Sequence, residues 1–184
     1  MLFSGAPGCG KTTLARETAQ SGEVSFIQVP PESLKGYKEV IDLLGEVDHN
    51  GYNKKGDVID EIKPTIIFID EIHRLPIQGQ EKLGIAMESY QIESDTDKNK
   101  FIWFPLFTVI GATTEEGILS KPFRDRFKLN FTFKLYDNEV LTDITAYHAS
   151  KMENITFTRK ACKDIAARSR GTPRIAVKYL ERAR

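Results

Sequence analysis

A glycine-rich stretch near the start of the sequence has the residue types and spacing of a phosphate-binding loop. The letters GAPGCGKTT at 5–13 fit G-x-x-x-x-G-K-[ST], with Gly5, Gly10, Lys11 and Thr12 at the fixed positions. Such glycines let successive backbone N–H groups converge on phosphate oxygens, the lysine reaches the terminal phosphates, and the hydroxyl binds Mg²⁺. The residues predicted to contact a nucleotide are Gly5, Ala6, Pro7, Gly8, Cys9, Gly10, Lys11, Thr12 and Thr13.

Two adjacent carboxylates end a stretch that is predicted to be a buried strand. Residues 65–69 are β-branched or aromatic, and the stretch 65–70 ends in Asp70, which Glu71 follows directly. Unpaired charges are costly to bury, so a cation is expected beside them. Asp70 is therefore predicted to hold Mg²⁺ together with Thr12, and Glu71 to orient or deprotonate an attacking water. A glutamate beside the aspartate favours a hydrolysing ATPase over a GTPase switch or a small-molecule kinase.

Alternating strand and helix patterns predict the elements that position these residues. Strands are expected at 1–4, 24–29, 65–70, 106–111 and 129–135, and helices near 11–20, 33–45, 78–90 and 115–120. This alternation is typical of an α/β fold with a parallel sheet that is covered on both faces. A polar loop is expected at 46–57, and 91–105 is predicted to be a β-hairpin with its tip at 93–100.

Helical patterns alone follow from about residue 137. They lie near 137–152, 158–170 and 173–184, with Gly171 placed to stop one helix and Thr172-Pro173 to start the next. The predicted domains are therefore an α/β domain at 1–136 and a small helical lid at 137–184.

Composition narrows the class of protein. Lysine plus arginine equals aspartate plus glutamate at 26 each, so no global basic field attracts nucleic acid, and any DNA contact must be local or made by another chain. The two cysteines lack metal-binding spacing, which suits a reducing compartment. No apolar run approaches the length of a membrane span. A cytoplasmic protein without a membrane partner is expected.

Four ordered blocks carry a resemblance to a known family. They read GAPGCGKTTLA, IIFIDEIHRL, FTVIGATTEEGILSKPFRDRF and ARSRGTPRIAVKYLERAR, and they span most of the chain. Together they resemble the AAA+ ATPase core of the RuvB family, the bacterial motors that drive branch migration of Holliday junctions. The resemblance implies a P-loop AAA+ core with a five-stranded parallel sheet, a helical lid, ATP and Mg²⁺ as cofactors, and a homo-oligomeric ring, a hexamer in the family.

The resemblance also implies roles for single residues. Thr114 occupies the sensor position, although a helix-capping role is the alternative because Thr113-x-x-Glu116 reads as a capping box. Arg126 is the expected arginine finger for the adjacent subunit, with Arg124 as the alternative. Two further assignments are open: Arg174 is a γ-phosphate sensor or a solvent-directed side chain, and both Arg126 and Arg124 could instead pair with surface acids. His73 is expected to pack or to form hydrogen bonds.

The sequence departs from the family at its ends and in the hairpin. The family's adenine-holding segment before the loop and its DNA-binding winged helix are both expected to be missing, so the chain reads as a core fragment or a minimal relative. DNA would then be reached through missing or partner domains. A RuvA-like partner is doubtful, because the hairpin's apolar residues are shifted to 101–104 and could simply pack on the core. The alternative functions are a clamp-loader-like or helicase-loading switch, or a nucleotide-binding adaptor.

Overall fold

The chain folds into two compact units, each described here by itself. The computed structural model describes residues 1–47, 64–97, 99–153 and 155–183. Unit 1 consists of Met1–Ser4 and Thr12–Phe131, and unit 2 of Gly5–Lys11 and Thr132–Arg184. The glycine-rich loop thus belongs to the same unit as the C-terminal helices. The domain boundary expected at residue 136 stays a prediction.

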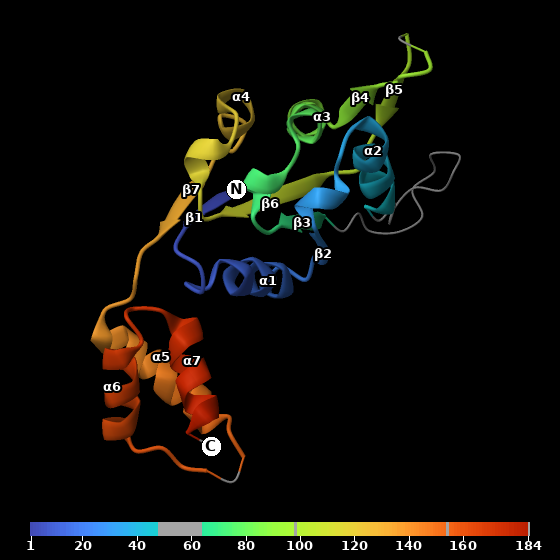
Figure 1. Ribbon diagram of the computed structural model, residues 1–184. Coiled ribbons are helices and arrows are strands. Elements are labelled where there is room, and N and C mark those ends of the chain that lie inside the picture. Colours follow the sequence, from blue (N-terminus) through green and yellow to red (C-terminus); the bar gives the residue numbers. More distant parts are fainter. Residues whose placement is uncertain (48–63, 98, 154, 184) are drawn as a thin grey trace. The chain divides into compact units, whose positions relative to one another are not determined.

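A five-stranded parallel sheet organises the α/β part of the chain (Figure 1). Its strands run in the order β2-β3-β6-β1-β7. They are β1 (Leu2–Gly5), β2 (Ser25–Val29), β3 (Thr65–Ile69), β6 (Phe107–Thr113) and β7 (Asn130–Phe133). The paired strands β1–β6, β2–β3 and β3–β6 are all parallel. The predicted α/β class and the five strands are confirmed.

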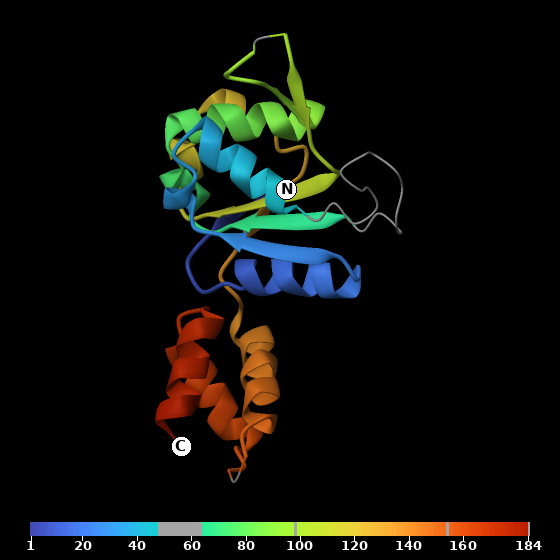
Figure 2. The same ribbon diagram turned by 90° about the vertical axis from the view of Figure 1, so that its right-hand side faces the viewer.

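Helices cover both faces of the sheet in unit 1. Figure 2 shows α1 along one face and α2 and α3 along the other. The helices are α1 (Lys11–Ser21), α2 (Tyr37–Glu46), α3 (Ile77–Ser89) and the short α4 (Lys121–Arg124), with 3-10 turns at Pro31–Ser33, Ile72–Arg74 and Glu116–Ile118. Two predicted helices were wrong in extent: the one expected at 33–45 begins only after Gly36, and 115–120 contains only a 3-10 turn.

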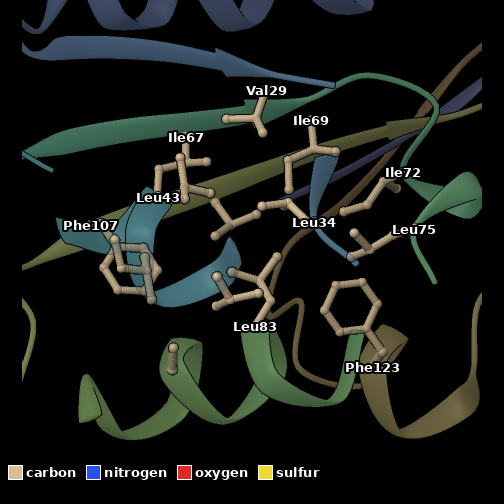
Figure 3. Packing of buried hydrophobic residues seen from close by; sticks show 14 of the residues in the cluster. Val29, Leu34, Leu43, Ile67, Ile69, Ile72, Leu75, Leu83, Phe107 and Phe123 are labelled. Carbon is tan, nitrogen blue, oxygen red and sulfur yellow. The ribbon is translucent and has the colours of Figure 1, made fainter. Parts of the chain in front are cut away.

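The packing of the main core explains why the residues of β3 form a nearly continuous apolar run. Every residue of β3 is buried, and Ile67 and Ile69 point into the cluster that contains Leu83 of α3 (Figure 3). Phe68 faces the other side and stacks on Phe26 of β2, with ring centroids 5.8 Å apart. Because successive side chains of a strand alternate between faces, a strand covered on both sides must be apolar throughout. The charge that follows at Asp70 marks the edge of this core.

The predicted hairpin is present as β4 (Gln91–Glu93) and β5 (Phe101–Trp103), which pair antiparallel with Ile92 opposite Ile102. Residues 94–100 connect the strands, as expected, with residue 98 outside the described part. Of the loop predicted at 46–57, all residues after 47 lie outside the described residues.

Three helices form the larger part of unit 2. They are α5 (Asn138–Ser150), α6 (Arg159–Arg168) and α7 (Pro173–Arg182). Asp137 and Thr158 cap the first two, accepting backbone N–H bonds at 2.8 and 3.2 Å. Gly171 has a φ of +72°, and a side chain there would lie 2.8 Å from Cβ of Leu135. Within the described residues, no helix is long and apolar enough to cross a membrane.

Candidate active site

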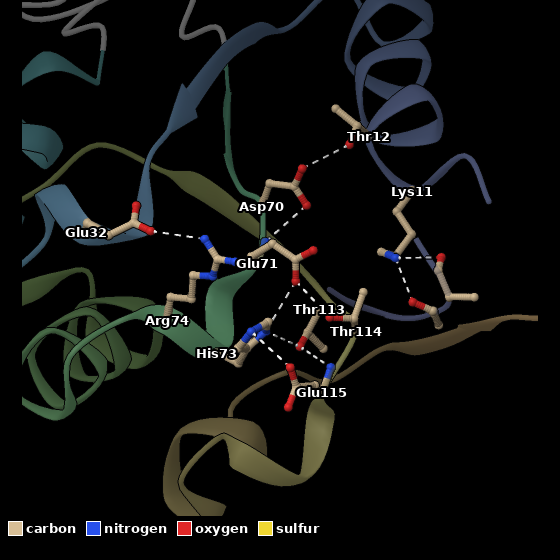
Figure 4. Close-up of polar contacts among 12 residues, drawn as sticks. Lys11, Thr12, Glu32, Asp70, Glu71, His73, Arg74, Thr113, Thr114 and Glu115 are labelled. Carbon is tan, nitrogen blue, oxygen red and sulfur yellow. Dashed lines mark hydrogen bonds and ion pairs between the residues drawn. The ribbon is translucent and has the colours of Figure 1, made fainter. Parts of the chain in front are cut away.

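The glycine-rich loop connects β1 to α1, and its lysine is folded back onto it. Lys11 is buried, and its Nζ donates to the carbonyl oxygens of Gly5 at 2.7 Å and Ala6 at 3.1 Å (Figure 4). A buried ammonium is costly unless it is hydrogen-bonded, so these carbonyls hold it in the loop. The lysine is therefore kept at the loop, where an anionic ligand would replace one or both carbonyls as its partner.

Two residues of the helical part of unit 2 hold the middle of the loop. The backbone N–H of Arg174 donates to the carbonyl of Gly8 at 3.3 Å, and the Tyr136 hydroxyl donates to the carbonyl of Cys9 at 3.2 Å. In a trans peptide the N–H points opposite to the C=O. The N–H groups of Cys9 and Gly10 are therefore turned to the other side, which is the arrangement an oxyanion requires.

Gly8 is required where the loop meets the start of α7. Its φ is +79°, and an added Cβ would lie 2.8 Å from Cβ of Arg174 and 3.0 Å from Cγ2 of Thr172. Thr172 is the N-cap residue and Pro173 the first residue of α7, as predicted, although the Thr172 side chain makes no capping bond. Arg174 thus lies in the opening turn of α7, beside the loop.

In unit 1, a hydroxyl and a carboxylate have the geometry of a cation site. Oγ1 of Thr12 lies 3.5 Å from Oδ2 of Asp70, while Oδ1 accepts the N–H of Glu71 at 3.0 Å. The first distance is long for an O–H···O bond. Octahedral Mg²⁺ with oxygens at about 2.1 Å places adjacent ligands about 3 Å apart, so this pair needs only a small adjustment. The hard oxygen donors also suit Mg²⁺.

Glu71 is fixed beside Asp70 by its backbone and by a threonine from the neighbouring strand. Its φ of +48° is left-handed, a conformation that costs a non-glycine residue about 1 to 2 kcal/mol. The Thr114 hydroxyl donates to its Oε2 at 3.0 Å. Residue Ile69 of β3 pairs with Gly111 of β6, so the ends of these parallel strands bring the predicted sensor residue and the predicted general base together.

The same strand ends connect this pair to the start of the loop. In the β1–β6 pairing, Ser4 lies opposite Thr113. Gly5, the first residue of the loop, follows Ser4, and Thr114 follows Thr113. Ligands of open parallel sheets bind outside the carboxyl ends of the strands, which is where Glu71 and Thr114 of unit 1 lie.

The alternative of a helix-capping role for Thr113 and Thr114 is wrong. The 3-10 turn begins at Glu116 and its N-cap residue is Glu115. Thr113 accepts the N–H of Glu115 at 2.9 Å, and Thr114 donates to Glu71 instead. The hydroxyl of Thr113 also lies 2.9 Å from Nδ1 of His73, a hydrogen bond that sequence reasoning could state only as a general expectation.

Arg126 lies against α3 of its own unit. Its Nη1 donates to the Pro122 carbonyl at 2.7 Å, and its Nε lies 3.5 Å from Oε2 of Glu88. Gly84 makes room for it, since a Cβ there would lie 2.8 Å from Cδ of Arg126. Arg126 therefore has a surface acid, Glu88, beside it in its own chain, and its role as the arginine finger of an adjacent subunit stays a prediction.

The hairpin's apolar side chains divide into two groups. Phe104 packs against the main core and Ile102 is half-buried. Phe101 and Trp103 are 53% and 70% exposed. The alternative that all four simply pack on the core is therefore wrong for Phe101 and Trp103, which alternate with Ile102 along the strand and face away from it.

The sequence of the chain matches known protein families over both of its parts. The family model described as the Holliday junction DNA helicase RuvB P-loop domain matches residues 1–133, and the RuvB AAA lid domain matches residues 136–184.

Individual RuvB proteins are similar in sequence to this chain over its whole length. A Holliday junction branch migration complex subunit RuvB from Streptococcus thermophilus is 36% identical over 188 residues, and one from Sulfurimonas denitrificans is 37% identical over 189. Each match covers 100% of this chain and 52% of the relative, so the chain spans about half the length of these curated relatives. The solved Thermotoga maritima RuvB Holliday junction branch migration motor superimposes with a TM-score of 0.80 at 32% identity, covering 98% of this chain and 52% of that one.

Proposed function

The chain belongs to the RuvB family, and on that premise we propose that it binds ATP with Mg²⁺ and hydrolyses it to drive branch migration of Holliday junctions. The observation that carries the proposal is the hydrogen bond from Thr114 to Glu71, next to an aspartate that faces Thr12. This bond brings the proposed water-activating carboxylate and the proposed sensor together at the carboxyl ends of β3 and β6. Asp70, the residue before Glu71, faces Thr12 of α1.

The glycine-rich loop binds the phosphates in this proposal. The residues in contact with the nucleotide are Gly5, Ala6, Pro7, Gly8, Cys9, Gly10, Lys11, Thr12, Thr13 and Arg174. Lys11 exchanges its carbonyl partners for phosphate oxygens, and the N-terminus of α1 adds its positive dipole. The Arg174 guanidinium contributes a positive charge toward the γ-phosphate, which would remove the unfavourable interaction of a cation with the N-terminus of α7.

Thr12 and Asp70 hold Mg²⁺ in the proposed complex. When bound, the ion neutralises charge on the terminal phosphates and polarises the γ-phosphoryl group. Glu71 accepts a proton from the attacking water, and Thr114 keeps one carboxylate oxygen oriented while the other faces that water. Asp70, whose other oxygen is held by the N–H of Glu71, keeps a fixed orientation through the cycle.

The complete motor in this proposal is a homo-oligomeric ring on four-way DNA. Arg126 completes the site of the adjacent subunit, and the exposed Phe101 and Trp103 offer an apolar hairpin surface to a protein partner. Because the chain's charges balance, DNA contact is made through local surfaces or through other domains. The proposed domains are 1–136 for the ATPase and 137–184 for the lid.

Nucleotide binding and turnover test the proposal directly. The chain is expected to bind a fluorescent ATP analogue and to release phosphate from ATP in a Mg²⁺-dependent way, and Lys11→Ala is expected to weaken binding at least tenfold. Lys38→Ala, an exposed lysine on α2, is the control and keeps parental binding. Binding without phosphate release would favour the adaptor alternative, and stimulation by a protein ring rather than by four-way DNA would favour a loading switch.

A further inference from the structure

His73 lies against the carboxylate that is proposed to activate water. Its side chain is 10% exposed, and Nδ1 lies 2.9 Å from Oγ1 of Thr113 and 3.3 Å from Oε2 of Glu71. The other ring nitrogen, Nε2, lies 3.8 Å from a carboxylate oxygen of Glu115 (Figure 4). One nitrogen therefore faces two oxygen atoms, and one of these belongs to Glu71.

The hydrogen bonds around these oxygens determine where the histidine carries a proton. An ionised carboxylate only accepts hydrogen bonds. Oε2 of Glu71 already accepts one from the Thr114 hydroxyl, so a lone pair on Nδ1 at 3.3 Å would face an anionic oxygen and be repelled. An N–H on Nδ1 removes this repulsion, and it can be shared with Oγ1 of Thr113, which also accepts the N–H of Glu115.

The backbone places the histidine on the same short turn as the glutamate. Glu71 precedes the 3-10 turn Ile72–Arg74, and the N–H of Arg74 donates to the Glu71 carbonyl at 2.9 Å. Because the turn fixes the spacing of Glu71 and His73, Nδ1 lies close both to the Thr113 hydroxyl and to Oε2 of Glu71. Thr113 itself is fully buried at the end of β6, so it is a rigid anchor.

We infer that His73 is a positioning residue: its Nδ1–H, anchored on Thr113, holds Oε2 of Glu71 and leaves Oε1 to the attacking water. This inference rests on the proposed role of Glu71 as the base. The Thr114 hydroxyl donates to Oε2 at 3.0 Å, and Nδ1 of His73 lies 3.3 Å from the same oxygen. Within the described residues, Oε1 accepts no hydrogen bond, so it is the oxygen available for a proton.

The position of the proton can be measured without any turnover. The chain has three histidines, so ¹⁵N-labelled imidazole signals are few, and His73→Asn identifies the signal of His73. We expect a proton on Nδ1 of His73. A neutral ring protonated only at Nε2 would overturn the inference, since Nδ1 would then accept from Thr113 and could not donate to Glu71.

Steady-state kinetics test the positioning role. His73→Ala is expected to lower kcat for ATP about ten- to a hundredfold, the usual range for losing a hydrogen bond to a charged group, with nucleotide affinity unchanged. In His73→Asn the side-chain amide lies close to where Nδ1 was, so this variant should recover most of the rate. Arg74→Ala is the control, because Arg74 is exposed, with its ion-pair partner Glu32 at 3.6 Å, and lies outside the network.

The outcomes separate the inference from the proposed function. Hydrolysis by the parent chain with an unchanged kcat in His73→Ala would overturn the positioning role and leave the function standing. Equal losses in His73→Ala and His73→Asn would also overturn it, because a donor at the Nδ1 position would then not matter. Absence of hydrolysis by the parent chain would remove the proposed function, and the NMR measurement would still decide whether Nδ1 carries the proton.

Discussion

The backbone N–H of Arg174 donates to the carbonyl of Gly8, and so the first turn of α7 is hydrogen-bonded to the glycine-rich loop. The Arg174 side chain also lies close to the Gly8 backbone: a Cβ added at Gly8 would lie 2.8 Å from Cβ of Arg174. A ligand that rearranges the loop backbone must therefore also shift the first turn of α7, within unit 2.

Gly8→Ala is expected to weaken nucleotide binding at least tenfold. The new Cβ would lie 2.8 Å from that of Arg174 in a backbone conformation that disfavours L side chains, so the loop must shift. Equilibrium titration with a fluorescent ATP analogue measures the effect. Gly117→Ala is the matched control, because a Cβ at Gly117 would have no neighbour within 4 Å. Equal affinities of the two variants would contradict the role given to Gly8.

Local sequence patterns predicted the parts of the site that one segment builds by itself. The loop around Lys11 and the pair Asp70–Glu71 each depend on a single strand end and its following residues, so spacing and residue type were sufficient. The contacts of His73 with Thr113, and of Thr114 with Glu71, depend on the register of β3 against β6. Register between strands that are distant in sequence is a tertiary property, and no local pattern encodes it.

The errors in the fold have similar causes. The 3-10 turn Pro31–Ser33 ends at Leu34 and Gly36 is the N-cap residue of α2, so the helix begins later than the pattern from residue 33 onward indicates. At Phe101 and Trp103, alternation predicted a strand correctly but not which face would be covered, because that depends on how the hairpin lies on its neighbours. The helical region was easier to predict, because Gly171 and Thr172-Pro173 mark helix boundaries by residue type alone.

Arg126→Ala is expected to lower ATP turnover by about three orders of magnitude or more if it acts as an arginine finger. Mixing Arg126→Ala with Lys11→Ala should restore part of the activity, since the second variant supplies the arginine and the first supplies an intact site. Phosphate release across a range of mixing ratios measures this. A mixture with no more activity than its two components would contradict action between subunits, and Arg124→Ala serves as the control.

Removing a helix cap is expected to destabilise unit 2. Asp137 accepts the N–H of Val140 at 2.8 Å and lies at the positive end of α5, so Asp137→Ala should lower the free energy of unfolding by about 1 kcal/mol. Urea denaturation followed by circular dichroism measures it. The control is Asp143→Ala, which removes only an exposed ion pair with Arg159 and should change stability by less than about 0.5 kcal/mol. Similar values for both variants would contradict the capping role.

Cys162 is expected to react slowly with alkylating reagents. Burial raises the pKa of its thiol, against a smaller lowering by the nearby Arg159 guanidinium, so less thiolate forms at a given pH than on a free cysteine. Its reactivity should therefore rise at a higher pH than that of a free thiol. Peptide mapping after timed labelling between pH 7 and 9.5 distinguishes it from Cys9. A rate equal to that of an unfolded control across this range would contradict the prediction.

The central claim is that Glu71 activates the water while Lys11 and the loop bind the nucleotide. Glu71→Gln keeps the shape and one acceptor oxygen but cannot take the proton, so it separates these steps. The most direct measurement is therefore ATP affinity and single-turnover hydrolysis for the parent chain and Glu71→Gln side by side. For Glu71→Gln we expect an affinity within about threefold of the parent and hydrolysis slowed by about 10² to 10⁴. Hydrolysis by Glu71→Gln at the parental rate would contradict it.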